Sequence, residues 1–557
     1  MKNFTPTLTL LFLLCIFNLS KAQGQDQNSV ESENASITFT YDNGWLPSNP
    51  LGIATSLDNI IIKSGIANIT INTLCSILTV DPGAALYVAS GITLTTDVLN
   101  LESTSQQYSS LISDGTIVGV ISYHKHTEQL GINDLISPPI SGQLFPEFAA
   151  ENLNLGYSGF TRAFAPYNTA AGAYQNYGIL SNASTFLEAG KGYRAATTDG
   201  GTLTFTGIPR TDDVLDISIS DASAGFAWNL IGNPYPSYID FETFFILNKS
   251  QFNTGTYQAI YGYDGDASDG WTVWNQASID SPVINELIAP GQAFFVKAKS
   301  GGGLVDFTTT MRCEGSSDDF ILGRSSSSPH HGHIQLKSSS SESNFSTDFY
   351  FNSNATQGFD PGYDSALFSE NPPAFSIYSH LVEDNSGTPL AVQTFNPIAM
   401  YDVVIPLGVN ASQGQEVTLS ITETDMPEDI IIYLEDTSNN SFTLLNTNDY
   451  VFTANDNLTG TGRFYLRFSG DALSVDKSNF TTVNIWFHDK TINISGQLLS
   501  ETKARLYDVN GRVVLTNTLN TNSAKQTIDV SHISAGIYIM ELDNKTNERR
   551  IEKLIIR

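Results

Sequence analysis

Cysteine is scarce in this 557-residue chain, which has only three. Cys15 lies in an apolar N-terminal stretch, and Cys75 and Cys313 lie in regions that we assign to different domains. A small core held together by many disulfides is therefore excluded. One Cys75–Cys313 bond would be possible in an oxidising compartment, but two buried thiols are the interpretation that we favour.

Long apolar runs and basic side chains are also few. After residue 22 no stretch approaches the ~18 uninterrupted apolar residues of a membrane-spanning helix, so we expect no transmembrane segment. Residues 23–476 hold 14 basic and 49 acidic side chains, whereas residues 477–557 hold 11 and 8. This acidity argues against nucleic acid or anionic lipid as a partner and serves solubility outside the cell. The change of sign predicts a domain boundary near residue 477.

The usual sequence signatures of catalysis are missing. No phosphate-binding loop, zinc-protease helix or dinucleotide-binding fingerprint occurs. Gly156-Tyr157-Ser158-Gly159 falls short of a nucleophile elbow, because its second glycine is one residue early and no helix-forming stretch follows. Carboxylates are plentiful, but their spacing favours no glycosidase pair. We therefore predict no catalytic residue and no cofactor.

Three groups of side chains have the chemistry of metal ligands but not the spacing. They are His330, His331 and His333; His124 and His126; and Asp264, Asp266 and Asp269. The first group lies in a Ser-rich segment without a nearby carboxylate, and nothing else converges on the second. The third departs from an EF-hand loop, because its last aspartate falls at position 6 instead of 5. We predict no metal site, and we expect turns at 264–270 and 360–364.

The N-terminus has the parts of a signal peptide. Lys2 supplies the charged start, residues 8–19 the apolar run, and 20–22 a small-x-small cleavage site. The predicted cleavage lies between Ala22 and Gln23. A lipoprotein attached through Cys15 is the alternative, although Leu13 and Leu14 make a poor lipobox.

The last 75 residues, 483–557, alternate short strands with turns. They contain Tyr507-Asp508-Val509-Asn510-Gly511-Arg512, then Gly536-Ile537-Tyr538, and they end in Lys553-Leu554-Ile555-Ile556-Arg557. Asn510-Gly511 favours a two-residue hairpin turn, because both positions tolerate positive φ. In this order the motifs resemble the C-terminal sorting domain (type A) of the bacterial type IX secretion system. Val483-Asn484-Ile485-Trp486-Phe487 replaces the Asn-Pro pair that is usual at its start.

This resemblance implies a localisation for the protein. It implies recognition by the type IX secretion machinery, export from the periplasm across the outer membrane, and removal of the domain. What precedes the domain would then be attached to the surface or released. We expect the removal within the polar bridge 470–479.

Turn residues separate short aliphatic strands about every eight residues over 37–118. This spacing favours a short β-solenoid, similar to the small parallel β-helix segments near the front of type IX secreted proteins. The expected strands are 59–62, 69–71, 78–80, 86–88, 92–94 and 98–101.

A duplication follows the predicted solenoid. Segments 134–139, 162–168, 188–195 and 205–210 match 229–234, 258–264, 289–296 and 307–312, in the same order. The offsets are 95, 96, 101 and 102. Two copies rich in Gly, Pro, aromatic and β-branched residues predict paired sandwich-like units. The second copy resembles a pattern of large secreted proteins that carry this sorting domain, a pattern that implies no activity.

The fold class that we predict is all-β and multidomain. The divisions are a signal peptide (1–22), a short β-solenoid (36–120), two β-sandwich-like repeats (121–222 and 223–320), a Ser-rich linker (321–344), a third β-sandwich (345–470) and an immunoglobulin-like sorting domain (480–557).

Export signals at both ends of a modular β-protein favour a non-enzymatic protein, secreted or on the cell surface, with a structural or adhesive role. A glycan-binding module is the first alternative. Trp271, Trp274 and Tyr261 would then stack on sugar faces, although most aromatic residues of such units belong to the core. A secreted polysaccharide hydrolase is the second alternative.

Overall fold

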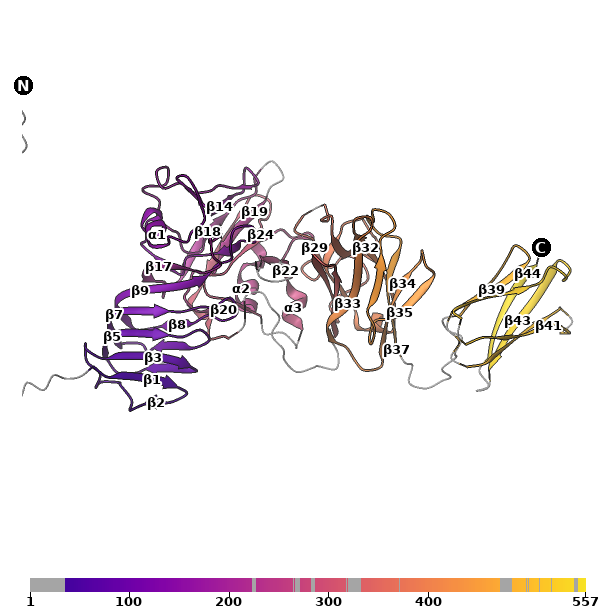
Figure 1. Cartoon of the computed structure of the whole chain (residues 1–557), viewed down its shortest axis with the longest axis horizontal. Coiled ribbons are helices and arrows are strands. Elements are labelled where there is room, and N and C mark those ends of the chain that lie inside the picture. The colour runs from indigo at the N-terminus through magenta and orange to yellow at the C-terminus, as the bar shows by residue number, and fades with distance from the viewer. Residues whose placement is uncertain are drawn as a thin grey trace, which may run out of the picture.

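The computed structural model is dominated by strands, at about 52% of the chain against 7% for helix. It describes residues 36–222, 227–263, 265, 271–281, 286–316, 318, 332–369, 371–470, 483–496, 498, 500–509, 511–521, 523–544 and 549–556. The predicted signal cleavage at Ala22 and Gln23 lies outside these residues, as do the bridge 471–479 and Arg557. The all-β, multidomain prediction is confirmed. The units follow one another from the solenoid at one end to the last domain at the other (Figure 1).

Residues 38–126 wind into a β-solenoid with two parallel sheets. The strands are β1 (Thr38–Asp42), β2 (Trp45–Leu46), β3 (Asn59–Ser64), β4 (Ile66–Ile69), β5 (Thr73–Val80), β6 (Ala85–Val88), β7 (Thr93–Leu101), β8 (Ser110–Ser113) and β9 (Thr116–His126). β1, β3, β5, β7 and β9 form one sheet, and β4, β6 and β8 form the other. Phe39, Ile60, Leu78, Leu99 and Ile121 are partners on successive strands, and all are buried. Each coil thus covers the apolar side chains of the next.

Antiparallel strands cover both ends of the larger solenoid sheet. β2 pairs with β1, and β17 (Thr202–Pro209) of the first repeat pairs with β9. Such strands shield edges at which sheets of separate molecules could otherwise join. The predicted boundary between residues 120 and 121 falls inside β9. The solenoid and the first repeat therefore share a sheet and have no linker between them.

The two repeats are built on the same strand order. In the first, the sheet runs β10-β16-β14-β15, and in the second it runs β19-β24-β21-β22. The first repeat contains β10 (Asp134–Ile136), β11 (Ile140–Ser141), α1 (Phe145–Glu151), β12 (Tyr157–Ser158), β13 (Thr161–Arg162), β14 (Phe164–Asn168), β15 (Ala173–Tyr174), β16 (Tyr193–Ala195) and β17. The second contains β18 (Val214–Ile219), β19 (Trp228–Gly232), β20 (Tyr238–Asp240), α2 (Phe241–Asn248), η1 (Lys249–Gln251), β21 (Ile260–Tyr263), β22 (Trp271–Trp274), α3 (Gln276–Asp280), β23 (Leu287–Ile288), β24 (Ala293–Lys297), β25 (Gly303–Phe307), η2 (Thr309–Met311) and β26 (Arg312–Cys313). The duplication found in the sequence is thus also a duplication of topology.

The repeats contact each other reciprocally. The Ser137 amide donates to the Gly291 carbonyl at 2.8 Å, and the Gly232 amide donates to the Gly190 carbonyl at 3.1 Å. Ser137 and Gly232 are equivalent positions, and so are Gly190 and Gly291, so the same contact is made in both directions. Two-fold dimers have self-complementary interfaces of this kind. A Cβ on Gly232 would lie 2.6 Å from that of Ser137, so this approach requires glycine.

Residues 332–470 form the third unit, an 11-stranded sheet folded onto itself. It contains β27 (Gly332–Ser339), β28 (Asn344–Phe351), β29 (Ser365–Ala366), β30 (Ser376–Ser379), β31 (Leu390–Phe395), η3 (Pro397–Tyr401), β32 (Asp402–Asn410), β33 (Glu416–Asp425), β34 (Ile430–Asp436), β35 (Ser441–Leu444), β36 (Tyr450–Thr453) and β37 (Phe464–Gly470). The two halves of the sheet meet where β30 pairs with β31. One apolar core receives side chains from both halves, among them Ile334, Phe349, Ile405 and Leu466.

The Ser-rich linker predicted over 321–344 is too long at its C-terminal end. Residues 332–339 form β27, which pairs with both β28 and β33. Ile334, Leu336 and Ser338 alternate along the strand, and all three are buried. Serine content suggested a solvated tether, but the period-2 alternation of apolar residues decides the structure. Residues 319–331 lie outside the described part.

The third unit packs tightly on the second repeat. Tyr261 Oη donates to the Ala366 carbonyl at 2.9 Å. Phe368 stacks on Trp271, with ring centroids 4.4 Å apart at 16°, and its centroid lies 4.5 Å from that of Trp228. The Phe368 and Trp271 rings are half-buried, and aromatic pairs add to the stability that area burial alone supplies. The junction is therefore a packed interface.

The last domain is a small sandwich with its own core. Its strands are β38 (Asn484–His488), β39 (Thr491–Ser495), β40 (Thr502–Tyr507), β41 (Val513–Leu519), β42 (Lys525–Asp529), β43 (Gly536–Asn544) and β44 (Arg549–Ile556). One sheet runs β38-β39-β42 and the other β41-β40-β43-β44. Apolar side chains from both sheets fill the space between them, from Val483 to Ile556.

Candidate functional site

The strand β44 divides the predicted export residues into two groups. Leu554 and Ile556 point into the core and are each 4% exposed. Lys553 and Ile555 point outward, and Ile555 is 52% exposed. β44 is the last strand of its sheet, next to β43. Two side chains thus anchor this strand, while two face outward and are exposed.

The remaining export residues hold the backbone around β40 and β43. Gly536 opens β43 opposite Ile556. Tyr538 is 9% exposed, and its hydroxyl donates to the Ser534 carbonyl at 2.8 Å. This bond fixes the start of β43, the direct partner of β44. The role of these residues in export remains a prediction.

The predicted hairpin between β40 and β41 is present, but its turn differs. Gly511 donates to the Asp508 carbonyl at 3.0 Å, and the Asp508 amide donates to the Arg512 carbonyl at 2.9 Å. The hairpin therefore closes at Asp508 and Arg512, and Gly511 has a positive φ of +78°. A glycine in this place is typical of hairpins that close with a bulge. Asn510 itself lies outside the described residues. The bond between Asp508 and Arg512 leaves three residues between the paired positions, so the prediction of a two-residue turn is wrong.

Two of the three aromatic residues proposed for sugar stacking belong to the core. Trp274 is 1% exposed and Tyr261 is fully buried, so neither ring can meet a glycan in this structure. On the paired strands β21 and β22, Trp274 lies opposite Ile260 and Tyr261 lies opposite Val273, so the two rings are on opposite faces of the sheet. Each ring is packed in a separate core. Trp271 differs, because it is half-buried and lines a pocket.

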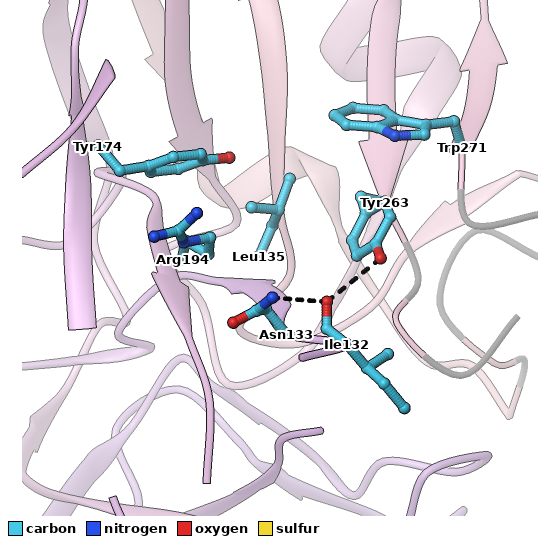
Figure 2. Close-up of a pocket in the computed structure, with 7 residues that line it drawn as sticks. All are labelled: Ile132, Asn133, Leu135, Tyr174, Arg194, Tyr263 and Trp271. Atoms are coloured by element: carbon cyan, nitrogen blue, oxygen red, sulfur yellow. Dashed lines mark hydrogen bonds between the residues drawn. The ribbon is translucent and has the colours of Figure 1, made fainter. Parts of the chain in front are cut away.

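This pocket, of about 160 Å³, lies where the two repeats meet (Figure 2). Its walls are Ile132, Asn133, Leu135, Tyr174 and Arg194 from the first repeat and Tyr263 and Trp271 from the second. Tyr174 and Trp271 are equivalent residues: Tyr174 pairs with Tyr167 in the first sheet, and Trp271 pairs with Tyr263 in the second. The pocket is thus a product of the duplication.

The polar side of the pocket consists of hydrogen-bonded groups and one cation. The Ile132 carbonyl accepts from Asn133 Nδ2 at 2.8 Å and from Tyr263 Oη at 3.2 Å (Figure 2). The Arg194 guanidinium lies 4.2 Å from the centroid of the Tyr174 ring. Burial raises the pKa of the Tyr174 phenol, although Arg194 opposes the shift. The phenol therefore stays protonated and can donate a hydrogen bond.

The described histidines that the sequence offered as possible metal ligands contact other groups. His124 Nδ1 lies 2.8 Å from Glu102 Oε2, and His126 Nε2 lies 3.1 Å from the Gly200 carbonyl oxygen. The expectation that His333 has no carboxylate nearby is wrong, because its Nε2 lies 2.9 Å from Asp348 Oδ1. Within the described residues no group of three potential ligands is assembled. His330, His331, Asp264, Asp266 and Asp269 lie outside those residues.

Neither cysteine beyond the N-terminus is paired. Cys75 is buried in the solenoid, and Cys313 is half-buried in the second repeat. Burial raises the pKa of both thiols, to about 12 for Cys313. Because the thiolate is the nucleophile, neither residue is suited to nucleophilic chemistry near neutral pH.

Two family models match the chain. One is described as a secretion system C-terminal sorting domain and matches residues 488–557. The other is described as Domain of unknown function (DUF8693) and matches residues 34–468. The chain belongs to this DUF8693 family. No curated protein matches the chain.

The DUF8693 region spans the solenoid, both repeats and the third unit, which the structure joins by shared sheets and packed contacts. The sorting domain confirms the type IX resemblance, and the chain is exported as a secreted or cell-surface protein with that machinery as a partner. None of the described helices has the length and apolar character needed to cross a membrane. The DUF8693 region is therefore the main body of an exported protein, and the sorting domain is its export signal.

Sequence reasoning missed Arg194 and Tyr174 as pocket residues. A signal was present for Arg194, because its counterpart in the aligned repeat is Phe295 and a charge replaces a ring. Tyr174 lies between the matched segments, so comparison of the repeats did not reach it. The register of the short β14–β15 pair reveals its equivalence to Trp271.

Proposed function

We propose that the DUF8693 region is a non-enzymatic body with a structural or adhesive role at the cell surface or in the medium. The observation that carries this proposal is the continuity of the β-structure. The solenoid sheet runs into the first repeat, the repeats exchange backbone hydrogen bonds, and the third unit packs on the second repeat. Such a body can transmit a load between its ends through the contacts between its described units.

The test compares cells that differ only in this protein. A strain lacking the gene should lose attachment to surfaces or cohesion between cells, and the full-length chain should restore it. Expression without residues 483–557 should not restore it, because the body would remain inside the outer membrane. Unchanged attachment and cohesion in the deletion strain would contradict the structural or adhesive role.

Glycan binding is the second candidate, and the pocket that contains Trp271 favours it. Aromatic walls suit the apolar faces of sugar rings, and the neighbouring arginine adds a polar contact. An array of polysaccharides probed with the mature chain tests this candidate. Release of reducing ends from any of these polysaccharides would instead support the alternative that the protein is a polysaccharide hydrolase.

A further inference from the structure

We propose that the pocket between the repeats binds a single carboxylate-bearing sugar ring, such as a hexuronic acid within an otherwise neutral glycan. The proposal deepens the glycan-binding candidate and rests on it. Size is the first argument. Pockets for drug-sized ligands measure roughly 300–1,000 Å³, whereas this one measures about 160 Å³. It suits one small ring of a larger molecule.

Arg194 supplies the contact for a carboxylate. Its guanidinium presents five donors in a planar fork, which matches the two oxygens of a carboxylate. Stacking on Tyr174 holds that plane in place and reduces the entropy lost on binding. Within the described residues Arg194 makes no ion pair. The carboxylate of Asp134, one residue before Leu135 on β10, accepts hydrogen bonds from the backbone amides of Glu128 and Gly265.

The other walls suit the ring of a sugar. Tyr263 and Trp271 lie across the pocket from the cation, and Leu135 lies between them and Arg194 (Figure 2). Phe368 stacks on one face of Trp271, so the other face or the edge of the indole is what remains for a ligand. The protonated hydroxyl of Tyr174 and the amide of Asn133 can bond to sugar hydroxyls. A mixed wall of this kind selects a ring with apolar C–H faces and polar substituents.

The negative charge of residues 23–476 further restricts the class of ligand that we expect. Residues 23–476 carry 14 basic and 49 acidic side chains, so a polyanion is repelled at long range. A single carboxylate in a neutral chain avoids most of this repulsion and still meets Arg194. We therefore expect glycans with sparse uronic acids to bind better than polyuronates at low salt, with the difference shrinking as salt is added.

The test uses the mature full-length chain and two probes that differ at one carbon. Methyl glucuronoside and methyl glucoside share the ring and differ only in carboxylate against hydroxymethyl. Saturation-transfer NMR and titration should show glucuronoside binding and glucoside binding about 10- to 100-fold more weakly, the effect of one charged hydrogen-bonded pair. Arg194→Gln should remove that preference. N-acetylphenylalanine presents a carboxylate on a peptide-like group and should bind weakly.

Arg162→Gln is the matched control, because Arg162 also lies over a tyrosine ring, that of Tyr157, but does not line the pocket. It should bind glucuronoside like the wild type, and thermal melts should show both variants folded. Trp271→Ala should weaken both sugars. Equal binding of the two sugars, an Arg194→Gln variant that keeps the preference, or tighter binding of N-acetylphenylalanine would overturn the proposal.

Two measurements distinguish this inference from the proposed function. They are glucuronoside binding through Arg194 and the attachment of cells that lack the gene. If wild-type chain fails to bind glucuronoside while the gene is still required for attachment, the pocket assignment fails and the adhesive role stands. If the gene is not required for attachment but glucuronoside binds through Arg194, the adhesive role fails and the pocket assignment stands.

Discussion

The two faces of β44 allow folding to be separated from recognition in export. Leu554→Ala and Ile556→Ala each delete a buried aliphatic side chain, at about 2–5 kcal/mol apiece. A domain of this size has a free energy of unfolding of about 4–10 kcal/mol in total. The double variant should therefore unfold the sorting domain. Lys553→Ala with Ile555→Ala changes outward side chains only and should cost about 0.5 kcal/mol or less each.

The assay measures folding and location on the same variants. Thermal melts of the purified chain report whether the sorting domain is folded, and immunoblots of periplasm, outer membrane and medium report where the protein is. We expect the outward pair to remain folded and yet accumulate in the periplasm, because a partner reads the presented side chains. Deletion of residues 553–557 should both unfold the sorting domain and leave the protein in the periplasm. Protein recovered from the surface should end near residues 470–479.

Normal export of the folded outward pair would refute the inference that Lys553 and Ile555 are presented for recognition. Normal export of a chain that lacks residues 553–557, with an intact sorting domain on the surface protein, would refute the role of the whole terminal motif.

Phe368→Ala should loosen the junction between the second repeat and the third unit and add an earlier thermal transition. Because Phe368 is half-buried, the cost should fall below the about 3–5 kcal/mol of a core phenylalanine. The exposed Phe160→Ala is its control, and a single unshifted transition would count against the packed junction. Burial raises the pKa of Asp364 to about 7, so its neutral form favours folding. The contribution of Asp364 to stability should be greatest below about pH 4 and be lost as pH rises to about 7, a change of up to about 4 kcal/mol. Thermal melts across pH should show this slope in the wild type and a flatter one in Asp364→Asn. Cys75 and Cys313 should both react with maleimide in denaturant without reductant, and a disulfide found by mass spectrometry would contradict the free thiols.

Regular periodicity made much of the fold predictable. Alternation along the solenoid located β3, β5, β6 and β7, although 92–94 and 98–101 are one strand and 69–71 shares only Ile69 with β4. The matched segments of the repeats anticipated equal sheets. The β27 strand was missed because Ser338 belongs to the inward row with Ile334 and Leu336, and small serine side chains fit inside a sheet as well as in a tether. Composition and alternation pointed in different directions there, and burial decided between them.

The pocket was less predictable because its residues meet only through the contact between repeats. Asn133, Arg194 and Trp271 are far apart in the chain and carry no shared motif. Aromatic residues such as Trp274 and Trp271 look alike in sequence, yet one fills a core and the other lines a pocket. Which side of a short strand faces outward depends on the neighbouring unit, and local sequence does not contain that information.

The two repeats carry different side chains at equivalent positions of their sheets, so their surfaces have different partners. Arg194 in β16 and Phe295 in β24 occupy the same register in the two sheets. Phe295 is buried and lies 5.0 Å from Phe368, so the second repeat receives the third unit at this position. Arg194 is half-buried and faces the pocket beside Tyr174. Two identical repeats would offer the same surface on both sides. The ring of Phe295 packs against the third unit, and the cation of Arg194 faces the pocket that we propose to bind an anionic ligand.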